Sequence, residues 1–323
     1  MARMTYDAGP GIVDPGLQPP RALDRPPRAD VGLIGFAVLM LSTSGPLIRW
    51  AAGGAPSMAI AMWRNALACV VLVPFALLTR RREFAGMTRR EWLLCVAAGL
   101  VLAAHFATWV PSISVTTVAS STALVALQPV WAALLARLAG DRIARAGWIG
   151  IAVAVAGAVA LSGVDFSVSG RAVWGDVLAT VGGMLSGAYV AIGGRVRQTV
   201  STTAYTSVCY LTTALTLTAV CLIGRQPMTG FRPSAWLAIG ALTLGPQLLG
   251  HSVFNHVLRT TSPTFVSLAI LFEVAGAALL AGLFFSEWPS VAAIPAAALI
   301  IVGIVIVVRG GSRPEVSGVV ALD

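Results

Sequence analysis

Long apolar stretches alternate with short polar gaps along this chain, from residue 31 to residue 308. Each stretch holds about 20 mostly apolar residues, enough for an α-helix to cross roughly 30 Å of hydrocarbon. The pattern therefore predicts an all-α polytopic membrane protein with about ten transmembrane helices. The expected spans are 31–51, 57–78, 92–113, 116–137, 146–163, 173–194, 203–223, 235–257, 264–285 and 290–308.

The two ends of the chain differ from this apolar middle. Residues 1–30 are rich in proline, arginine and aspartate and have little apolar periodicity, which predicts a disordered N-terminal tail. Residues 309–323 are expected to form a C-terminal tail. Most loop arginines fall on one side if the N-terminus is cytoplasmic, so the positive-inside rule predicts a multi-pass protein of the cell membrane with both termini cytoplasmic. The inner-loop arginines are Arg80, Arg81, Arg82, Arg89, Arg90, Arg142, Arg145, Arg195, Arg197 and Arg259, against Arg171, Arg225 and Arg232 outside.

Composition supports the membrane assignment and excludes other classes. The chain is 57% hydrophobic and 11% charged, whereas soluble domains average about 25% charged residues. The net charge of +9 resides in arginines scattered between apolar runs, so we expect no nucleic-acid partner. The four cysteines lie inside apolar runs without a Cys-x-x-Cys spacing, which favours packing over a metal site. No metal and no cofactor is expected.

An internal repeat divides the chain into two halves. The segment that starts at His105 and runs to Gln128-Pro129 has an echo about 145 residues later, from His251 to Glu273. We interpret 31–163 and 171–308 as two five-helix repeats. Because five is odd, the second repeat enters the membrane from the opposite side, and inverted repeats are typical of alternating-access transporters.

Several short stretches in this order resemble the EamA-type carriers of the drug/metabolite transporter superfamily. The stretches are Ser44–Arg49, Trp63–Asn65, His105–Trp109, Gln128–Pro129, Gly250–Asn255 and Glu273. The resemblance covers residues 31–308 and implies transport of small metabolites across the cytoplasmic membrane, frequently export of amino acids or toxic compounds. One departure is Val274, which follows Glu273 where the family often has proline.

Polar side chains inside the expected spans are the candidates for a substrate cavity. In span eight, Gln247, His251 and Asn255 follow one another at intervals of four residues, which aligns them along one side of a helix. In span three, His105 and Trp109 mirror this arrangement. The stripe lines either a cavity or a hydrogen-bonded seam between helices, and each histidine is either a cavity residue or a satisfied core residue.

Span four contributes Gln128 to the same expected cavity, which we place mainly between spans three, four, eight and nine. Prolines inside spans free a backbone carbonyl and bend the helix. We therefore expect Pro129 and above all Pro246, one residue before the polar stripe, to act as hinges.

Two charged residues lie deep in the expected spans. A central charge costs about 2.5–3.5 kcal/mol on insertion scales, so each needs a partner or a function. Glu273 either binds a coupling proton or pins the crossing of two helices. Arg64, about 10 Å from the outer face by helical rise, pairs with a carbonyl, with Glu273 or with an anionic group of the substrate.

The motifs of soluble enzymes and ATPases are absent: there is no lysine for a Walker motif, no G-x-S-x-G and no H-E-x-x-H. We therefore expect a secondary transporter, not an enzyme, that exports a small metabolite, amino acid or drug-like compound, with protons as a candidate coupling ion. The alternative is a membrane scaffold or accessory subunit without transport. A monomer is the simpler expectation because one chain holds both halves; a homodimer remains open.

Overall fold

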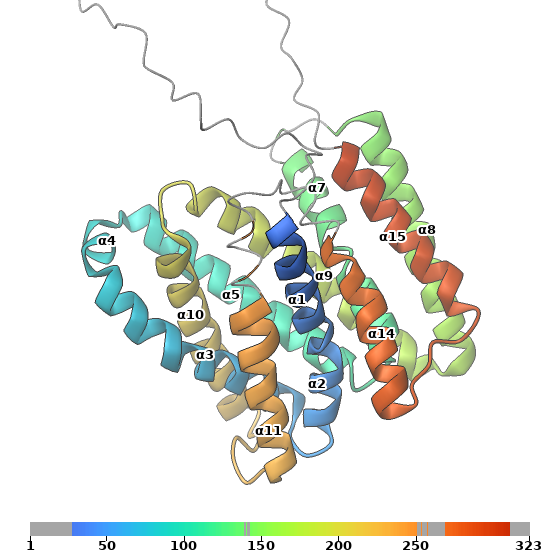
Figure 1. The fold of residues 1–323 in the computed structure, drawn as a ribbon, viewed down its shortest axis with the longest axis horizontal. Helices are drawn as coiled ribbons and strands as arrows, with labels where there is room; N and C mark the ends of the chain where they lie inside the picture. The colour runs from blue at the N-terminus through green and yellow to red at the C-terminus, as the bar shows by residue number, and fades with distance from the viewer. Residues whose placement is uncertain are drawn as a thin grey trace, which may run out of the picture.

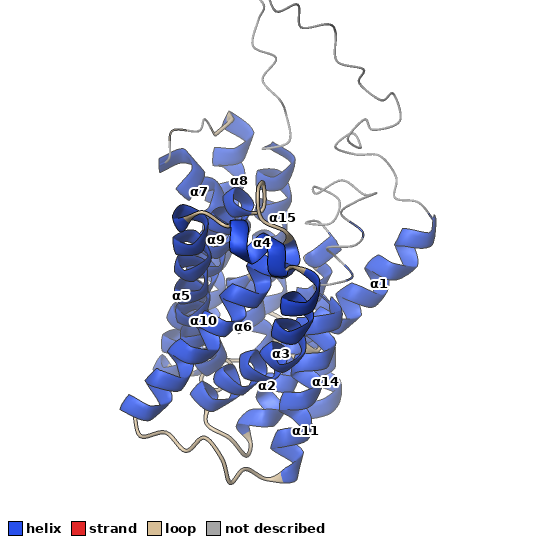
Figure 2. Cartoon of the chain, turned by 90° about the vertical axis from the view of Figure 1, so that its left-hand side faces the viewer, coloured by secondary structure: helices blue, strands red, loops and turns tan. Residues whose placement is uncertain are grey.

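The computed structural model describes residues 28–138, 140, 143–250, 253, 257 and 269–310. This part of the chain is almost entirely helical and contains no strand (Figure 2). The helices are α1 (Arg28–Ser42), α2 (Ser44–Ala52), α3 (Ser57–Thr79), α4 (Arg81–Gly86), α5 (Arg89–Ser112), α6 (Val118–Val125), α7 (Gln128–Leu138), α8 (Arg145–Val168), α9 (Gly170–Val196), α10 (Thr202–Ile223), α11 (Pro233–Leu242), η1 (Thr243–Gly250), α14 (Phe272–Phe285) and α15 (Ala293–Gly310).

The expected all-helical membrane fold is confirmed. Eight described segments are long and apolar enough to cross a membrane. The remaining two expected spans correspond to α11 continued by η1 and to the shorter apolar helix α14. Most of the residues between η1 and α14 lie outside the described part of the chain.

Spans one and four differ from their expected form, because each is broken into two helices. The first break separates α1 from α2 at Thr43, and the second separates α6 from α7 at residues 126–127. Pro46 and Pro129 stand in the first turns of α2 and α7. Proline lacks an N–H and clashes with the carbonyl four residues earlier, so it is tolerated in a first turn but not in a helix interior.

Span eight is also irregular, in a different way. After Leu242 the α-helix widens into the π-helix η1, which contains Pro246 and Gln247. Pro246 removes the amide hydrogen that would bond to the carbonyl of Leu242, and a widened turn accommodates the lost bond. Pro246 thus lies in a π-helical stretch that also contains Gln247, and its role as a hinge stays a prediction.

The helices pack as a bundle in which counterparts from the two halves meet. Figure 1 shows α8 and α15 side by side at one edge and α3 with α10 at the other, and the contacts agree. Between these pairs, α5 packs on α9 while α1 and α2 pack on η1 and α11. Each of these contacts has a counterpart in the other half. A contact between two spans recurs between the two spans that lie five places further along or back in the chain.

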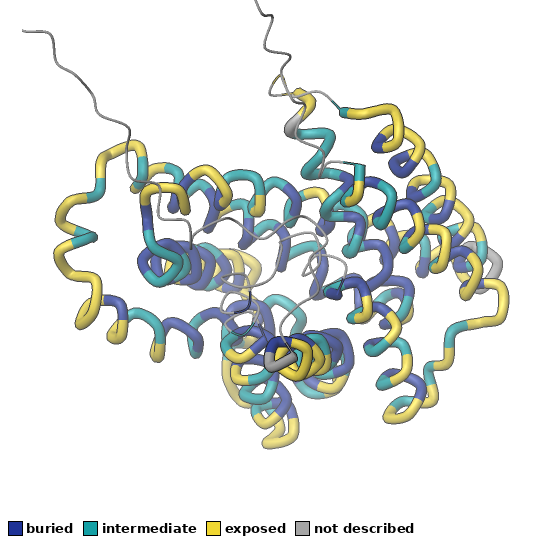
Figure 3. The backbone as a smooth tube through the Cα atoms, turned by 45° about the horizontal axis from the view of Figure 1, so that its top comes forward, coloured by how far each residue is buried: buried dark blue, intermediate teal, exposed yellow. Residues whose placement is uncertain are grey.

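Exposed positions lie on the outward sides of the peripheral helices, and buried positions face the middle of the bundle (Figure 3). The exposed residues include large apolar side chains such as Val70, Leu78 and Val159, as expected of a surface that contacts lipid. Small residues bring helices close together in the interior. At Gly303 a side chain would overlap the backbone of Ala154, so α15 and α8 are in direct backbone contact.

Candidate substrate cavity

A cavity of about 430 Å³ lies in the middle of the bundle between the two halves. Its walls come from α1, α2, α3, α5, α6, α7, α9, α10, η1 and α14. It extends to Arg197 and Thr202 at the connection between α9 and α10, on the side that the arginine bias predicts to be cytoplasmic. The position and size suit a small-molecule site.

A buried polar cluster joins α3 to η1 at one wall of the cavity. The Arg64 Nε donates a hydrogen bond to Gln247 Oε1 at 2.5 Å, and Gln247 Nε2 donates to Asn65 Oδ1 at 3.1 Å. Asn65 in turn donates to the carbonyl of Ala61. Only 2% of Arg64 and 3% of Gln247 are exposed. The π-helical turn therefore presents Gln247 to Arg64, and the amide fixes one end of the guanidinium.

The second wall is aromatic and comes from α5. The guanidinium carbon of Arg64 lies 4.5 Å from the ring centre of Phe106, a favourable cation–π contact. The rings of His105 and Trp109 stack with centres 5.4 Å apart. His105 Nδ1 also lies 2.8 Å from the carbonyl oxygen of Gly182 in α9. Span three thus contributes ring surface, and its histidine has a partner in the neighbouring helix.

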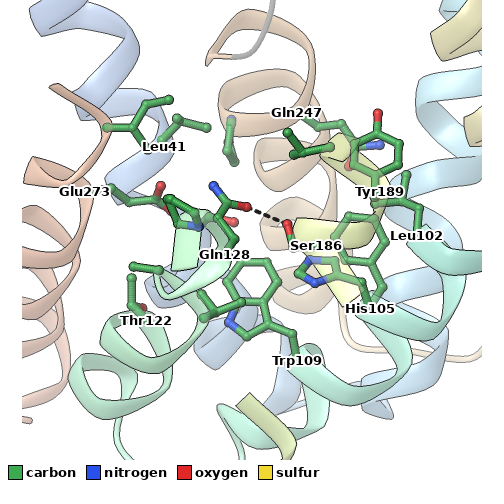
Figure 4. A pocket seen from close by; sticks show the side chains of 18 of the residues that line it. Leu41, Leu102, His105, Trp109, Thr122, Gln128, Ser186, Tyr189, Gln247 and Glu273 are labelled. Atoms are coloured by element: carbon green, nitrogen blue, oxygen red, sulfur yellow. Dashed lines mark hydrogen bonds between the residues drawn. The ribbon is translucent and has the colours of Figure 1, made fainter. Parts of the chain in front are cut away.

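Helix α9 approaches this wall closely because it is rich in glycine. Side chains at Gly183 and Gly187 would meet the backbone of α6 and α7 within about 3 Å, at the carbonyls of Val125 and Gln128. The close contact brings Ser186 to the cavity, where its hydroxyl donates to Gln128 Oε1 at 2.5 Å (Figure 4). The small residues of α9 therefore position the expected cavity residue Gln128.

Three tyrosines, Tyr189, Tyr205 and Tyr210, complete the lining from α9 and α10. The rings of Tyr189 and Tyr205 stack with centres 5.9 Å apart. From sequence alone, a tyrosine in an apolar helix can either line a cavity or pack in a core.

Glu273 lies in the first turn of α14 and faces the cavity from the side opposite Gln247 (Figure 4). A carboxylate is favoured in a first turn because the helix N-terminus carries partial positive charge. Glu273 and Arg64 both line the cavity, but no direct ion pair joins these two residues. The carboxylate and the guanidinium are therefore both directed to the cavity and remain separate.

The expected site residues divide into two groups. The structure brings His105, Trp109, Gln128, Gln247, Arg64 and Glu273 to one cavity, together with Pro129 and Pro246. His251 and Asn255 lie outside the described residues. Other residues, which the sequence did not assign to the cavity, also line it, notably Ser186, Phe106 and Arg197.

A separate ion pair fastens the opposite end of the bundle. Arg49, at the end of α2, donates from Nε to Glu287 Oε1 at 2.6 Å and from Nη1 to the carbonyl of Ile113 at 2.9 Å. Ile113 caps the C-terminus of α5, and Glu287 lies in the connection between α14 and α15. One side chain thus joins three segments of the bundle.

Comparison with known proteins agrees with this architecture. The model of the EamA-like transporter family matches residues 31–163 and 173–309. No curated protein matches the chain. A solved structure, titled only as a crystal structure of a protein, superposes with a TM-score of 0.61 at 21% identity, over 86% of this chain and 96% of its own; this likeness concerns the fold alone. With two repeats that together span most of its length, the chain belongs to the EamA-like transporter family.

Proposed function

We propose that this protein is a secondary transporter that exports a small metabolite, amino acid or drug-like compound across the cytoplasmic membrane by alternating access. The observation that carries the proposal is the cavity between the two halves, which is lined by buried polar groups of both repeats, including Arg64 and Gln247. Polar groups inside a membrane protein are costly, and they mark substrate pathways.

The packing of the halves supports an inverted relation between the repeats. Helices α3 and α10 meet as counterparts, as do α8 and α15, which is the arrangement expected around a twofold axis. Because each repeat holds an odd number of spans, this axis lies in the membrane plane. The repeats, 31–163 and 171–308, can then rock against each other and expose the cavity to one side at a time.

The loop arginines support an orientation with both termini in the cytoplasm. The cavity extends to the same side, at Arg197 and Thr202. Arg49 holds the outer ends of α2, α5 and the α14–α15 connection together. In this proposal the described conformation corresponds to an inward-facing state, in which the Arg49 contacts hold the outer ends of the helices together.

The experiment that tests transport uses purified protein in liposomes loaded with a mixture of organic acids, amino acids, nucleosides, sugars and cationic drugs. The solutes that remain inside after dilution are measured by mass spectrometry. We expect the protein to release at least one solute faster than protein-free liposomes do. Release of none, with folded protein in both orientations, would favour the scaffold function instead.

Two matched variants connect transport to the cavity. Ser186→Trp fills the cavity from α9, and we expect it to abolish release. Val159→Trp adds the same side chain on the lipid-facing side of α8, where 68% of Val159 is exposed, and release should continue. Equal effects of both variants would contradict transport through this cavity.

Glu273 is the proposed proton-coupling residue, because its carboxyl faces the cavity without a direct ion pair to Arg64. With an imposed pH gradient, the wild type should accumulate the solute against its concentration gradient. Glu273→Gln keeps the shape but binds no proton, so it should still exchange solute without responding to the gradient. Unchanged gradient-driven accumulation in this variant would exclude Glu273 from coupling.

A further inference from the structure

Arg64 is a buried cation whose hydrogen bonding is incomplete. Of its three nitrogens only Nε has a hydrogen-bond partner within the described part of the chain, the side-chain oxygen of Gln247. Its Nη1 is fully covered by protein and bonded to nothing there. A buried charge is strongly unfavourable unless it is paired and hydrogen-bonded. The Arg64 guanidinium would therefore be stabilised by an anionic partner.

The described residues do not supply this partner directly. Gln247, which holds Nε, is neutral, and it is itself fixed by Asn65. Glu273 also lines the cavity but forms no ion pair with Arg64. The Phe106 ring covers the guanidinium carbon at 4.5 Å. The Gln247 bond and the Phe106 ring thus orient the guanidinium, and no described residue supplies a counterion to it. The planar guanidinium group suits a carboxylate.

A second unpaired group on the cavity wall is a donor as well. The Trp109 indole Nε1 is buried and has no hydrogen-bond partner among the described residues, and an indole nitrogen can only donate. Buried donors without acceptors predict a ligand that supplies oxygen acceptors.

The rest of the lining is apolar and aromatic. Phe106 and the stacked pair Tyr189 and Tyr205 contribute ring surface, and Leu41 and Leu102 contribute aliphatic surface. The volume of about 430 Å³ accommodates a compact organic molecule and excludes a macromolecule.

From these contacts we infer that the transported solute is a small amphipathic organic anion, whose carboxylate binds the Arg64 guanidinium and whose apolar body lies against the aromatic wall. This inference rests on the proposed transport function and specifies its substrate class. Trp109 Nε1 serves a second polar group of the solute. The bound carboxylate supplies the direct ion pair that Glu273 does not form with Arg64.

The test uses three probes that share one body and differ in charge: 3-phenylpropanoate, 3-phenylpropanamide and 3-phenylpropylamine. Binding to the purified full chain is measured by calorimetry, and release from liposomes is measured in parallel. We expect the carboxylate to bind at least about tenfold more tightly than the amide, a difference of about 1.4 kcal/mol, and the amine to bind most weakly. A carboxylate that binds no better than the amide or the amine overturns the inference.

Variants attribute the preference to its residues. Arg64→Gln should remove the preference for the carboxylate, and Arg64→Lys should retain part of it, because lysine keeps the charge but not the planar fork. Arg90→Gln removes an exposed arginine from the start of α5 and should change nothing. Trp109→Phe keeps an aromatic ring and removes the indole N–H donor, so it should weaken carboxylate binding severalfold. It tests the contribution of the aromatic wall even if Arg64→Gln misfolds.

Binding and transport together separate the two proposals. Release of the amide or the amine without release of the carboxylate would leave transport standing and refute the anion assignment. Preferential carboxylate binding without release of any solute would retain the assignment of the site and refute transport. A carboxylate preference that survives Arg64→Gln would place the anion elsewhere and refute the role of Arg64.

Discussion

Spans three and eight occupy equivalent places in the two repeats, yet they contribute different chemical groups to the cavity. His105 and His251 stand 146 positions apart, and the same shift relates Gly99 to Gly245 and Val101 to Gln247. Span three is the regular helix α5, packed on α9 and α10. Span eight starts as α11 and widens into η1. The first presents rings to the cavity, and the second presents an amide.

The two glycines show how this difference arises in packing. A side chain at Gly99 would meet Thr212 Cβ at 2.6 Å and the carbonyl of Cys209 at 2.8 Å, whereas at Gly245 the nearest atom would be 3.8 Å away. Thr213 of α10 also donates to the carbonyl of Gly99 at 2.9 Å. Tight packing keeps α5 regular, and the looser surroundings of Gly245 leave room for a π-helical turn. Duplication thus conserves the positions of helices and not their roles.

The largest effect is expected where span eight meets Arg64. Gln247→Leu leaves the buried Arg64 Nε and Asn65 Oδ1 without their partner. Loss of a hydrogen bond to a buried charge, with the charge left in place, should lower the free energy of unfolding by about 3 kcal/mol. The measurement is reversible unfolding in mixed detergent micelles.

The matched control is Val101→Leu at the equivalent position of span three, where a half-buried apolar residue gains one methylene. Its effect should stay below about 1 kcal/mol. Similar losses of unfolding free energy for both variants would mean that the hydrogen bonds among Arg64, Gln247 and Asn65 are not what distinguishes the two spans.

Close packing of span three gives the next effect. Gly99→Ala forces α5 and α10 apart, since the new methyl group overlaps Thr212 and the Cys209 carbonyl. Overpacking of this kind costs about 1–3 kcal/mol. Gly245→Ala meets nothing closer than 3.8 Å, so its unfolding free energy should change by less than about 0.5 kcal/mol. Equal destabilisation at both glycines would refute the contrast in packing.

The sequence contained the spans and the repeat but not the contacts between them. Apolar periodicity located the spans because each must satisfy its backbone within the membrane, and the polar positions Gln247 and Glu273 stood out against it. That Arg64 bonds to Gln247, 183 positions away, depends on the π-helical turn, which local pattern does not encode. Ser186 and Tyr189 are ordinary residues in sequence, and only the glycine-mediated approach of α9 brings them to the cavity.

A smaller effect tests the histidine of span three. His105→Phe keeps a ring against Trp109 but loses the contact between Nδ1 and the Gly182 carbonyl. The net contribution of one such hydrogen bond is about 1 kcal/mol, so the unfolding free energy should fall by that amount. In His105→Asn the side-chain nitrogen takes the place of Nδ1, and we expect it to restore most of the loss. If His105→Asn is no better than His105→Phe, the contact with α9 is not what stabilises this position.

The smallest effect concerns the C-terminal end of span three, which Arg49 holds through the carbonyl of Ile113 while it pairs with Glu287. About a third of the Arg49 side chain and a fifth of Glu287 remain exposed, at 33% and 19%, so solvent weakens the pair and its coupling free energy should be about 0.5–1 kcal/mol. A double-mutant cycle with Arg49→Gln and Glu287→Gln measures it.

Arg49→Gln should cost more than Glu287→Gln, because Glu287→Gln leaves the bond to the C-terminus of α5 intact and a cation there is favourable. The coupling should also shrink in high salt; a salt-independent value, or equal costs of the two single variants, would show that Arg49 does not fasten span three.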